Sequence, residues 1–165
     1  MSDTEPPSET GSAAGADKVV RVERVIAASP EAIFAVLADP NRHQDFDGSG
    51  TVRAARSDAP ERLTLGSRFG MNMRLGVPYR TTNEVVEFDE GRLIGWRHVG
   101  GHVWRYRLEA VEGAEPPATL VVEEFDWSTN RAPLMLKVMK AIPRNEKAMR
   151  ATLERLASLV EPAGT

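Results

Sequence analysis

The chain has no cysteine among its 165 residues, and only 6% of its residues are aromatic. Without cysteine there are no disulfides, thiolate metal ligands or cysteine nucleophile, so chemistry must come from histidine, carboxylates, hydroxyls or arginine. The chain also lacks an apolar run of the ~20 residues that a membrane-spanning helix needs. Its first residues lack the basic-then-apolar pattern of a signal peptide. We therefore expect no integral membrane segment and a cytoplasmic protein.

An excess of basic charge is missing too, since 21 Lys and Arg stand against 24 Asp and Glu. Four of those acids and none of the bases fall in residues 1–17, so the rest of the chain is nearly neutral. Nucleic-acid binding requires a basic stripe that neutralises phosphates. The arginines here are interspersed with acids, and we expect no nucleic-acid partner.

Residues 1–17 contain no aromatic residue and no Val, Ile or Leu. Such a segment cannot bury enough apolar surface to offset the entropy lost on folding. We predict a disordered leader over residues 1–17 and a single domain over residues 18–161.

Alternating apolar and charged residues predict a first strand over residues 18–27. Ser29, Pro30 and Glu31 then predict a helix start, with the serine as N-cap. A second short helical turn is expected over residues 41–46. Hairpin-like spacing predicts six further strands, at about residues 51–57, 67–75, 79–89, 92–99, 102–112 and 118–127.

A long apolar stripe at helical spacing occupies the last third of the chain and continues across Pro143, where we expect a kink or a split. Its members are Met135, Val138, Met139, Ile142, Met149, Leu153, Leu156 and Val160. A helix of this length that follows strands needs a concave sheet to lie in. The sequence therefore predicts an α+β fold, in which a curved antiparallel seven-stranded sheet wraps a long C-terminal helix.

This order of elements, with the segments GSRFGMNMRLGVPYRTTNEVVEF, GRLIGWRHVGGHVWRYRLE and NEKAMRATLERLASLVE, resembles the SRPBCC superfamily of START-like and birch-allergen-like proteins. Within it, the chain is similar to the polyketide cyclase/dehydrase-like group over residues 18–161. The resemblance implies a helix-grip fold with a hydrophobic ligand cavity between sheet and helix. Members include lipid carriers, polyketide cyclases and chaperone activators, so the fold alone does not select an activity.

Strand alternation predicts which side chains face that cavity. Two strands place aromatic and histidine side chains on one face, and the last strand adds an acid and a phenylalanine. Methionines suit adaptable apolar walls and complete the predicted lining. The predicted ligand-binding residues are Trp96, His98, His102, Trp104, Tyr106, Glu123, Phe125, Met71, Met73, Met135 and Met139.

The polar side chains in this set have three interpretations. They are packing groups, or they orient a carbonyl or hydroxyl of an apolar ligand. In the catalytic alternative, His98 or His102 is a general acid or base tuned by Glu123, for an aldol cyclisation or a dehydration. We commit to no catalytic residue, because no nucleophile stands beside a base. His98 and His102 span a glycine turn and His43 is distant in sequence, so we expect no metal and no cofactor.

We therefore predict a protein that binds an apolar or aromatic, lipid-like or polyketide-like small molecule in an internal cavity. The first alternative is a cyclase or dehydratase that uses the same cavity. The second is a protein-interaction module of the chaperone-activator type. The sequence specifies no oligomeric state.

Overall fold

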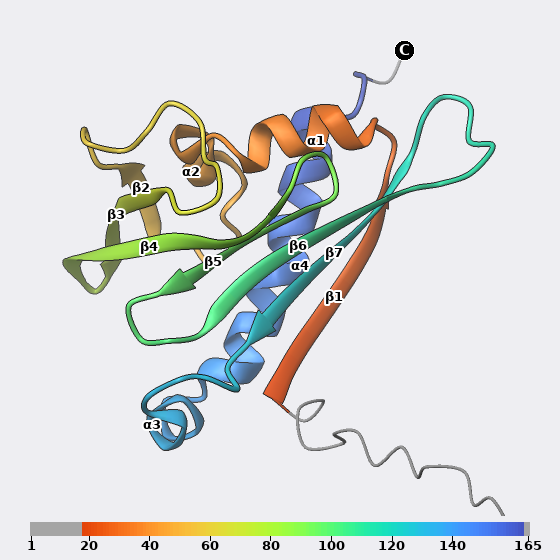
Figure 1. Ribbon diagram of the computed structural model, residues 1–165. Coiled ribbons are helices and arrows are strands. Elements are labelled where there is room, and N and C mark those ends of the chain that lie inside the picture. Colours follow the sequence, from red (N-terminus) through yellow and green to blue (C-terminus); the bar gives the residue numbers. More distant parts are fainter. Residues whose placement is uncertain (1–17, 164–165) are drawn as a thin grey trace, which may run out of the picture.

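The computed structural model describes residues 18–163, which form one curved sheet with helices on its concave side and at its ends (Figure 1). The predicted leader lies outside the described residues. The strands are β1 Val19–Ile26, β2 Val52–Ala55, β3 Arg68–Leu75, β4 Val77–Asp89, β5 Leu93–His98, β6 Val103–Ala110 and β7 Thr119–Asp126. The helices are α1 Pro30–Leu37, the 3₁₀ turn η2 Pro40–Arg42, α2 His43–Phe46, α3 Pro133–Val138 and α4 Ala141–Val160.

All seven strands belong to one sheet in the order β1-β7-β6-β5-β4-β3-β2, and every neighbouring pair is antiparallel. The strands from β2 to β7 follow one another as a meander. The first strand closes the other edge against β7, with Val19 opposite Asp126. The predicted seven-stranded α+β helix-grip fold is confirmed.

The α1 helix begins as its sequence predicts. The Ser29 hydroxyl oxygen accepts a hydrogen bond from the Ala32 backbone N–H at 3.2 Å, and Pro30 occupies the first helical turn. An N-cap of this kind stabilises a helix by about 1 kcal/mol. The helix buries Ile33, Phe34 and Leu37 against the core.

The C-terminal helical region is split, but the break lies before Pro143 rather than at it. Lys140 adopts a left-handed backbone conformation with φ of 50°, which separates α3 from α4. Pro143 is the third residue of α4, where its missing N–H removes no necessary hydrogen bond. A continuous helix would require that N–H to bond the carbonyl of Met139, four residues earlier. The chain therefore ends α3 at Val138, with Met139 as its C-cap, and starts α4 at Ala141.

The first three residues of the predicted stripe do not reach the core. None of the α3 residues is buried, and Met135, Val138 and Met139 are 60%, 74% and 51% exposed. The prediction that one apolar stripe packs along its whole length is wrong for this part. Leu153 and Leu156 of α4 are fully buried, as predicted.

The two faces of the sheet differ in chemistry. On the concave side, the C-terminal half of α4 packs against β1, β7 and α1 in a closed hydrophobic core. On the opposite face, the Arg105 guanidinium donates hydrogen bonds to Glu87 and to Glu124 Oε2, the latter at 3.0 Å. The convex face is thus held by charge pairs, which leaves the concave face for apolar contacts.

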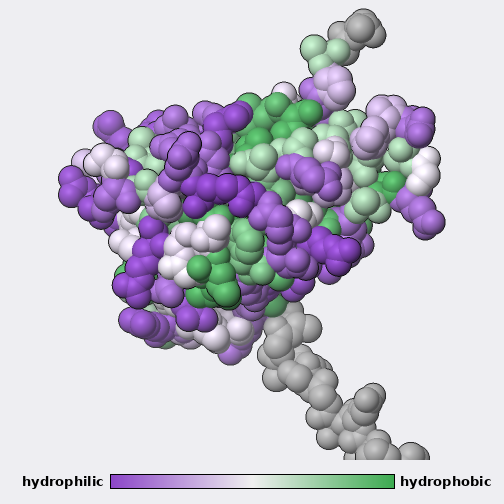
Figure 2. Space-filling view, turned by 45° about the horizontal axis from the view of Figure 1, so that its top comes forward, coloured by the Kyte–Doolittle hydropathy of each residue, from purple (hydrophilic) through white to green (hydrophobic). Residues whose placement is uncertain are grey.

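A space-filling view, turned so that the top of Figure 1 comes forward, shows mostly hydrophilic residues with a few hydrophobic patches between them (Figure 2). Among the described residues, no helix is long and apolar enough to cross a membrane.

Candidate functional site

A cavity of about 550 Å³ lies between the sheet and the N-terminal half of α4. Its walls come from α2, the loop before β2, strands β2 to β7, α3 and α4. In the C-terminal half of α4, the side chains fill the space between the helix and the sheet. In its N-terminal half, α4 presents Ala141, Ala148 and Met149 to the sheet and leaves room for the cavity. The volume is that of an ordinary small-molecule site.

Nine of the eleven predicted binding residues line this cavity: Met71, Met73, Trp96, His98, His102, Trp104, Tyr106, Glu123 and Phe125. The other two, Met135 and Met139, lie outside it, and their prediction as lining residues is wrong. Both belong to the stretch before the break at Lys140, where the two methionine side chains face solvent. Leu136 is the side chain of α3 that reaches the cavity.

The middle of the cavity wall is aromatic. Trp96 pairs with Trp104 across β5 and β6, and Trp104 pairs with Phe125 across β6 and β7. The rings of Trp104 and Phe125 lie 4.6 Å apart between centroids. Such cross-strand aromatic contacts stabilise the sheet and also form a flat apolar surface.

Two stacked imidazoles lie beside this aromatic row, at the turn between β5 and β6. The rings of His98 and His102 are 4.5 Å apart and nearly parallel. His98 Nδ1 accepts the Gly100 backbone N–H at 3.0 Å, and His102 Nδ1 lies 3.1 Å from Asn130 Nδ2. An amide nitrogen only donates, so both rings carry their proton on Nε2.

Burial keeps both rings uncharged. It lowers the pKa of His102 from 6.5 to about 4, with His98 as a further cause, and it also lowers the pKa of His98. In this tautomer each ring offers one N–H donor through Nε2. A metal ion bound at Nε2 would need the proton on Nδ1, where a donor already points. Among residues 18–163, no three His, Cys, Asp or Glu side chains are grouped to hold a metal.

Glu123 is a carboxyl side chain of the cavity wall that is fully buried. Its Oε1 accepts a hydrogen bond from the Tyr106 hydroxyl at 2.9 Å, and its Oε2 has no partner within the described part of the chain. Burial raises the pKa of Glu123 from 4.5 to about 8, and the nearby Asp47 charge adds to this, while the Tyr106 hydrogen bond opposes it. At neutral pH the group is therefore mainly a carboxylic acid.

The predicted coupling of Glu123 to a histidine is not found. Glu123 lies opposite Tyr106, which is four residues along β6 from His102. At about 3.3 Å per residue, His102 and the Tyr106–Glu123 pair are about 13 Å apart along the strand. The row of Trp104 and Phe125 lies between them. Glu123 and the pair of His98 and His102 thus lie at two separate places in the cavity, with an aromatic stretch between them.

His43 is a site residue that the sequence analysis considered only as a metal ligand. Its Nε2 donates to the Leu37 carbonyl oxygen at 2.9 Å, and its ring stacks on Trp96 with centroids 4.9 Å apart. Burial lowers the pKa of His43 to about 4. The available signal was its place three residues before Phe46, on the same face of a short helix beside the expected cavity.

The loop after α2 forms one side of the cavity, and its Gly48 packs closely against α4. The Gly48 N–H donates to Thr152 Oγ1 at 2.9 Å. A Cβ atom at Gly48 would lie 2.2 Å from the Ala148 carbonyl oxygen, so no other residue fits here without moving the loop. The neighbouring Asp47 accepts the Val52 backbone N–H at 3.0 Å and so ties the loop to β2.

The chain matches the family described as "Polyketide cyclase / dehydrase and lipid transport" over residues 18–161, and it belongs to that family. The predicted resemblance to the SRPBCC superfamily is thereby confirmed.

Two relatives from Mycobacterium tuberculosis are uncharacterised proteins. Rv0088 of strain H37Rv is 42% identical over 115 residues, and MT0096 of strain CDC 1551 is 41% identical over 115 residues. Each match covers 69% of this chain and 49% of the relative. The chain thus spans about half the length of the curated relatives it matches.

Solved structures share the fold at low sequence identity. Protein NE0264 of Nitrosomonas europaea has a TM-score of 0.64 at 14% identity, covering 87% of this chain and 94% of that one. Major latex-like protein 151 of Panax ginseng has a TM-score of 0.62 at 12% identity, with coverage of 87% and 97%. The Aha1 dimer of Colwellia psychrerythraea has a TM-score of 0.58 at 17% identity, with coverage of 87% and 96%. At these identities the likeness concerns the fold alone.

Proposed function

We propose that the protein binds an apolar or aromatic small molecule, lipid-like or polyketide-like, in the cavity between the sheet and α4. The observation that carries the proposal is the composition of the wall. A row of Trp96, Trp104 and Phe125 across β5, β6 and β7 provides apolar contact area, and polar side chains such as His102 and Glu123 lie beside it. Ligand sites in proteins have this combination of extensive apolar lining and few polar groups.

The polar groups at both ends of the row define what the ligand offers. The His98 and His102 rings present Nε2–H donors, and Glu123 in its acid form carries a proton as well. A ligand that meets them with carbonyl, ether or hydroxyl oxygens satisfies these donors. The preferred ligand is therefore apolar in its body, with oxygen acceptors placed about 13 Å apart or less.

A fluorescent hydrophobic dye tests the proposal. We expect about one dye per chain, quenching of tryptophan emission, and an affinity at least about tenfold weaker in Trp104→Ala. Trp127→Ala is the control, because Trp127 is a buried tryptophan that lies outside the cavity wall, whereas Trp104 is partly buried within it. Affinity is compared per folded molecule, with melting curves for both variants. Equal affinities in the two variants would place the dye elsewhere.

A second candidate, cyclase or dehydratase chemistry in the same cavity, is supported by the buried acid next to Tyr106. A carboxyl with a pKa near neutrality is able to give and take a proton at working pH. Glu123→Gln separates the two functions. An acid or base role predicts a loss of turnover of roughly 10²–10⁴ with ligand affinity nearly unchanged. The role of a chaperone-activator-type interaction module stays an untested prediction.

A further inference from the structure

The exposed large apolar side chains of the described residues are not spread evenly. Seven of the twelve lie on two segments, the turn between β3 and β4 and the region of α3. They are Leu75, Val77, Tyr79, Leu134, Met135, Val138 and Met139. Single exposed apolar residues are ordinary on protein surfaces, but clusters of this kind indicate an interaction surface.

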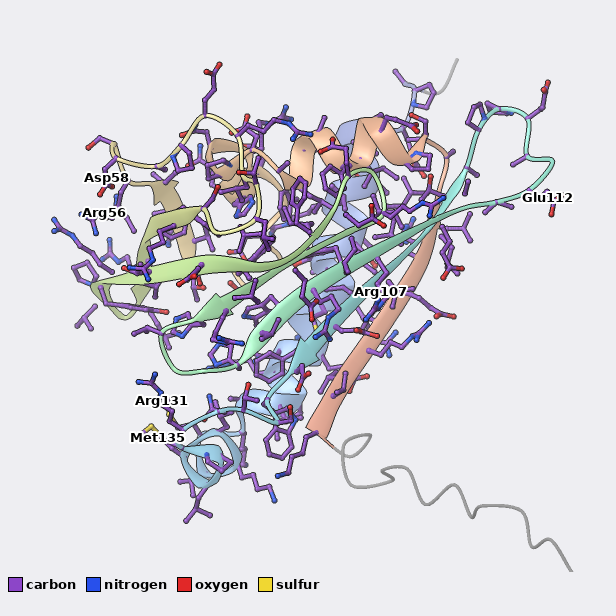
Figure 3. All side chains as sticks on the ribbon, viewed as in Figure 1. Arg56, Asp58, Arg107, Glu112, Arg131 and Met135 are labelled. Atoms are coloured by element: carbon purple, nitrogen blue, oxygen red, sulfur yellow. The ribbon has the colours of Figure 1, made fainter. Side chains whose placement is uncertain are left out.

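Both segments border the cavity. Leu75 and Tyr79 of the hairpin and Leu136 of α3 belong to the cavity wall, together with Arg144 of α4. Figure 3 shows Arg131 and Met135 beside α3, on the opposite side of the molecule from Glu112, which lies in the turn between β6 and β7. The β3–β4 hairpin and the α3 region thus border the cavity, and we call their exposed apolar side chains the rim surface.

The rim surface is also the basic part of an acidic chain. Residues 127–145, which include α3, contain four Lys and Arg and no Asp or Glu, while the whole chain has a net charge of −3. The four bases are Arg131, Lys137, Lys140 and Arg144. All four are exposed, and none has an ion-pair partner within residues 18–163.

We propose that the rim surface docks the protein onto an anionic lipid membrane, with the opening of the cavity facing the lipid. Exposed apolar side chains beside unpaired bases are the two features by which peripheral proteins bind anionic bilayers. A second copy of this chain is a poor occupant, because a two-fold contact would bring two sets of four positive charges together. Docking in this orientation gives an apolar ligand a path between bilayer and cavity without crossing water.

Vesicle co-sedimentation of the full chain tests the proposal. We expect binding to vesicles of phosphatidylcholine with 30% phosphatidylserine, little binding to phosphatidylcholine alone, and a decline as salt screens the charges. Lys137→Gln with Lys140→Gln is expected to weaken binding roughly thirtyfold. Leu134→Ser with Val138→Ser is expected to weaken it by at least about tenfold.

Matched controls remove the same chemistry elsewhere. Val25→Ser with Leu65→Ser replaces two exposed apolar residues outside the rim surface. Arg24→Gln with Arg97→Gln replaces two exposed bases that form no ion pair with any other described residue. Neither control should change vesicle binding by more than about twofold. All these residues are exposed, so each variant is expected to melt like the parent protein.

Equal binding to neutral and anionic vesicles would overturn the proposal, and so would rim variants that bind like the controls. Concentration-dependent dimerisation that Leu134→Ser with Val138→Ser abolishes would also overturn it, because the rim surface would then be a contact between copies. Dye binding without vesicles is measured on every variant. Loss of dye binding in the parent protein would contradict the proposed ligand function and leave the docking result to stand on its own.

Discussion

Replacing Glu123 by glutamine should change how the stability of the protein depends on pH. The side chain is enclosed, its pKa is raised to about 8 mainly by burial, and among residues 18–163 only Tyr106 forms a hydrogen bond with it. Because its folded pKa lies above the unfolded value of 4.5, its stabilising contribution is complete below about pH 4.5 and is lost as the pH rises towards about 8.

The magnitude follows from linkage. One pKa unit corresponds to about 1.36 kcal/mol, so a shift from 4.5 to about 8 makes Glu123 cost the folded state about 4 kcal/mol more at pH 9 than at pH 5. Glutamine has the same shape and cannot ionise. Its amide nitrogen takes a place without a partner, but that cost does not depend on pH.

Denaturant unfolding at pH 5, 6, 7, 8 and 9 measures the effect. We expect the difference in unfolding free energy, variant minus parent, to rise by about 4 kcal/mol across this range. Glu124→Gln is the control, because Glu124 is the next residue but faces the Arg105 pair on the convex side. A parallel pH profile for Glu123→Gln and the parent protein would refute the argument that Glu123 is enclosed as an acid.

Three other substitutions test separate parts of the structure. Leu156→Ala should lower the free energy of unfolding by about 2–5 kcal/mol, while Met139→Ala should change it by less than about 0.5 kcal/mol, and equal losses in urea unfolding would show that Met139 is packed. Gly48→Ala should lower the melting temperature by several degrees and weaken dye binding, because the loop must leave α4, and an unchanged melting curve would contradict the close approach. The parent protein should lose stability between pH 6.5 and 4, because the folded state holds the His43 ring neutral, and in His43→Gln this loss should be smaller by about 3 kcal/mol. An equal loss of unfolding free energy in both proteins over this pH range would contradict the burial of His43.

The strands and the first helix were predictable because their signals are local. Alternation along each strand gives the buried face directly, and Ser29 with Pro30 gives the helix start. Alternation also brought His98, Tyr106 and Glu123 to one side of the sheet, where the structure has them in one cavity.

The α3 region was not predictable in the same way. Helical periodicity reports that apolar residues share a face, but it does not report whether that face meets a partner. One left-handed residue, Lys140, changes the direction of the chain and turns Met135 and Met139 to solvent. His43 was missed for a related reason, because its contact with Trp96 joins elements 53 residues apart in sequence.

The positions of the methionine methyl groups provide the most direct test of ligand binding in the cavity. Met71, Met73 and Met149 line the cavity, whereas Met135 and Met139 lie outside it. NMR spectra of the protein with ¹³C-labelled methionine methyl groups, recorded during titration with the hydrophobic dye, distinguish these two sets. The account predicts that the three cavity methyl signals shift and saturate together at about one dye per chain, while those of Met135 and Met139 stay in place. Shifts confined to Met135 and Met139 would contradict it.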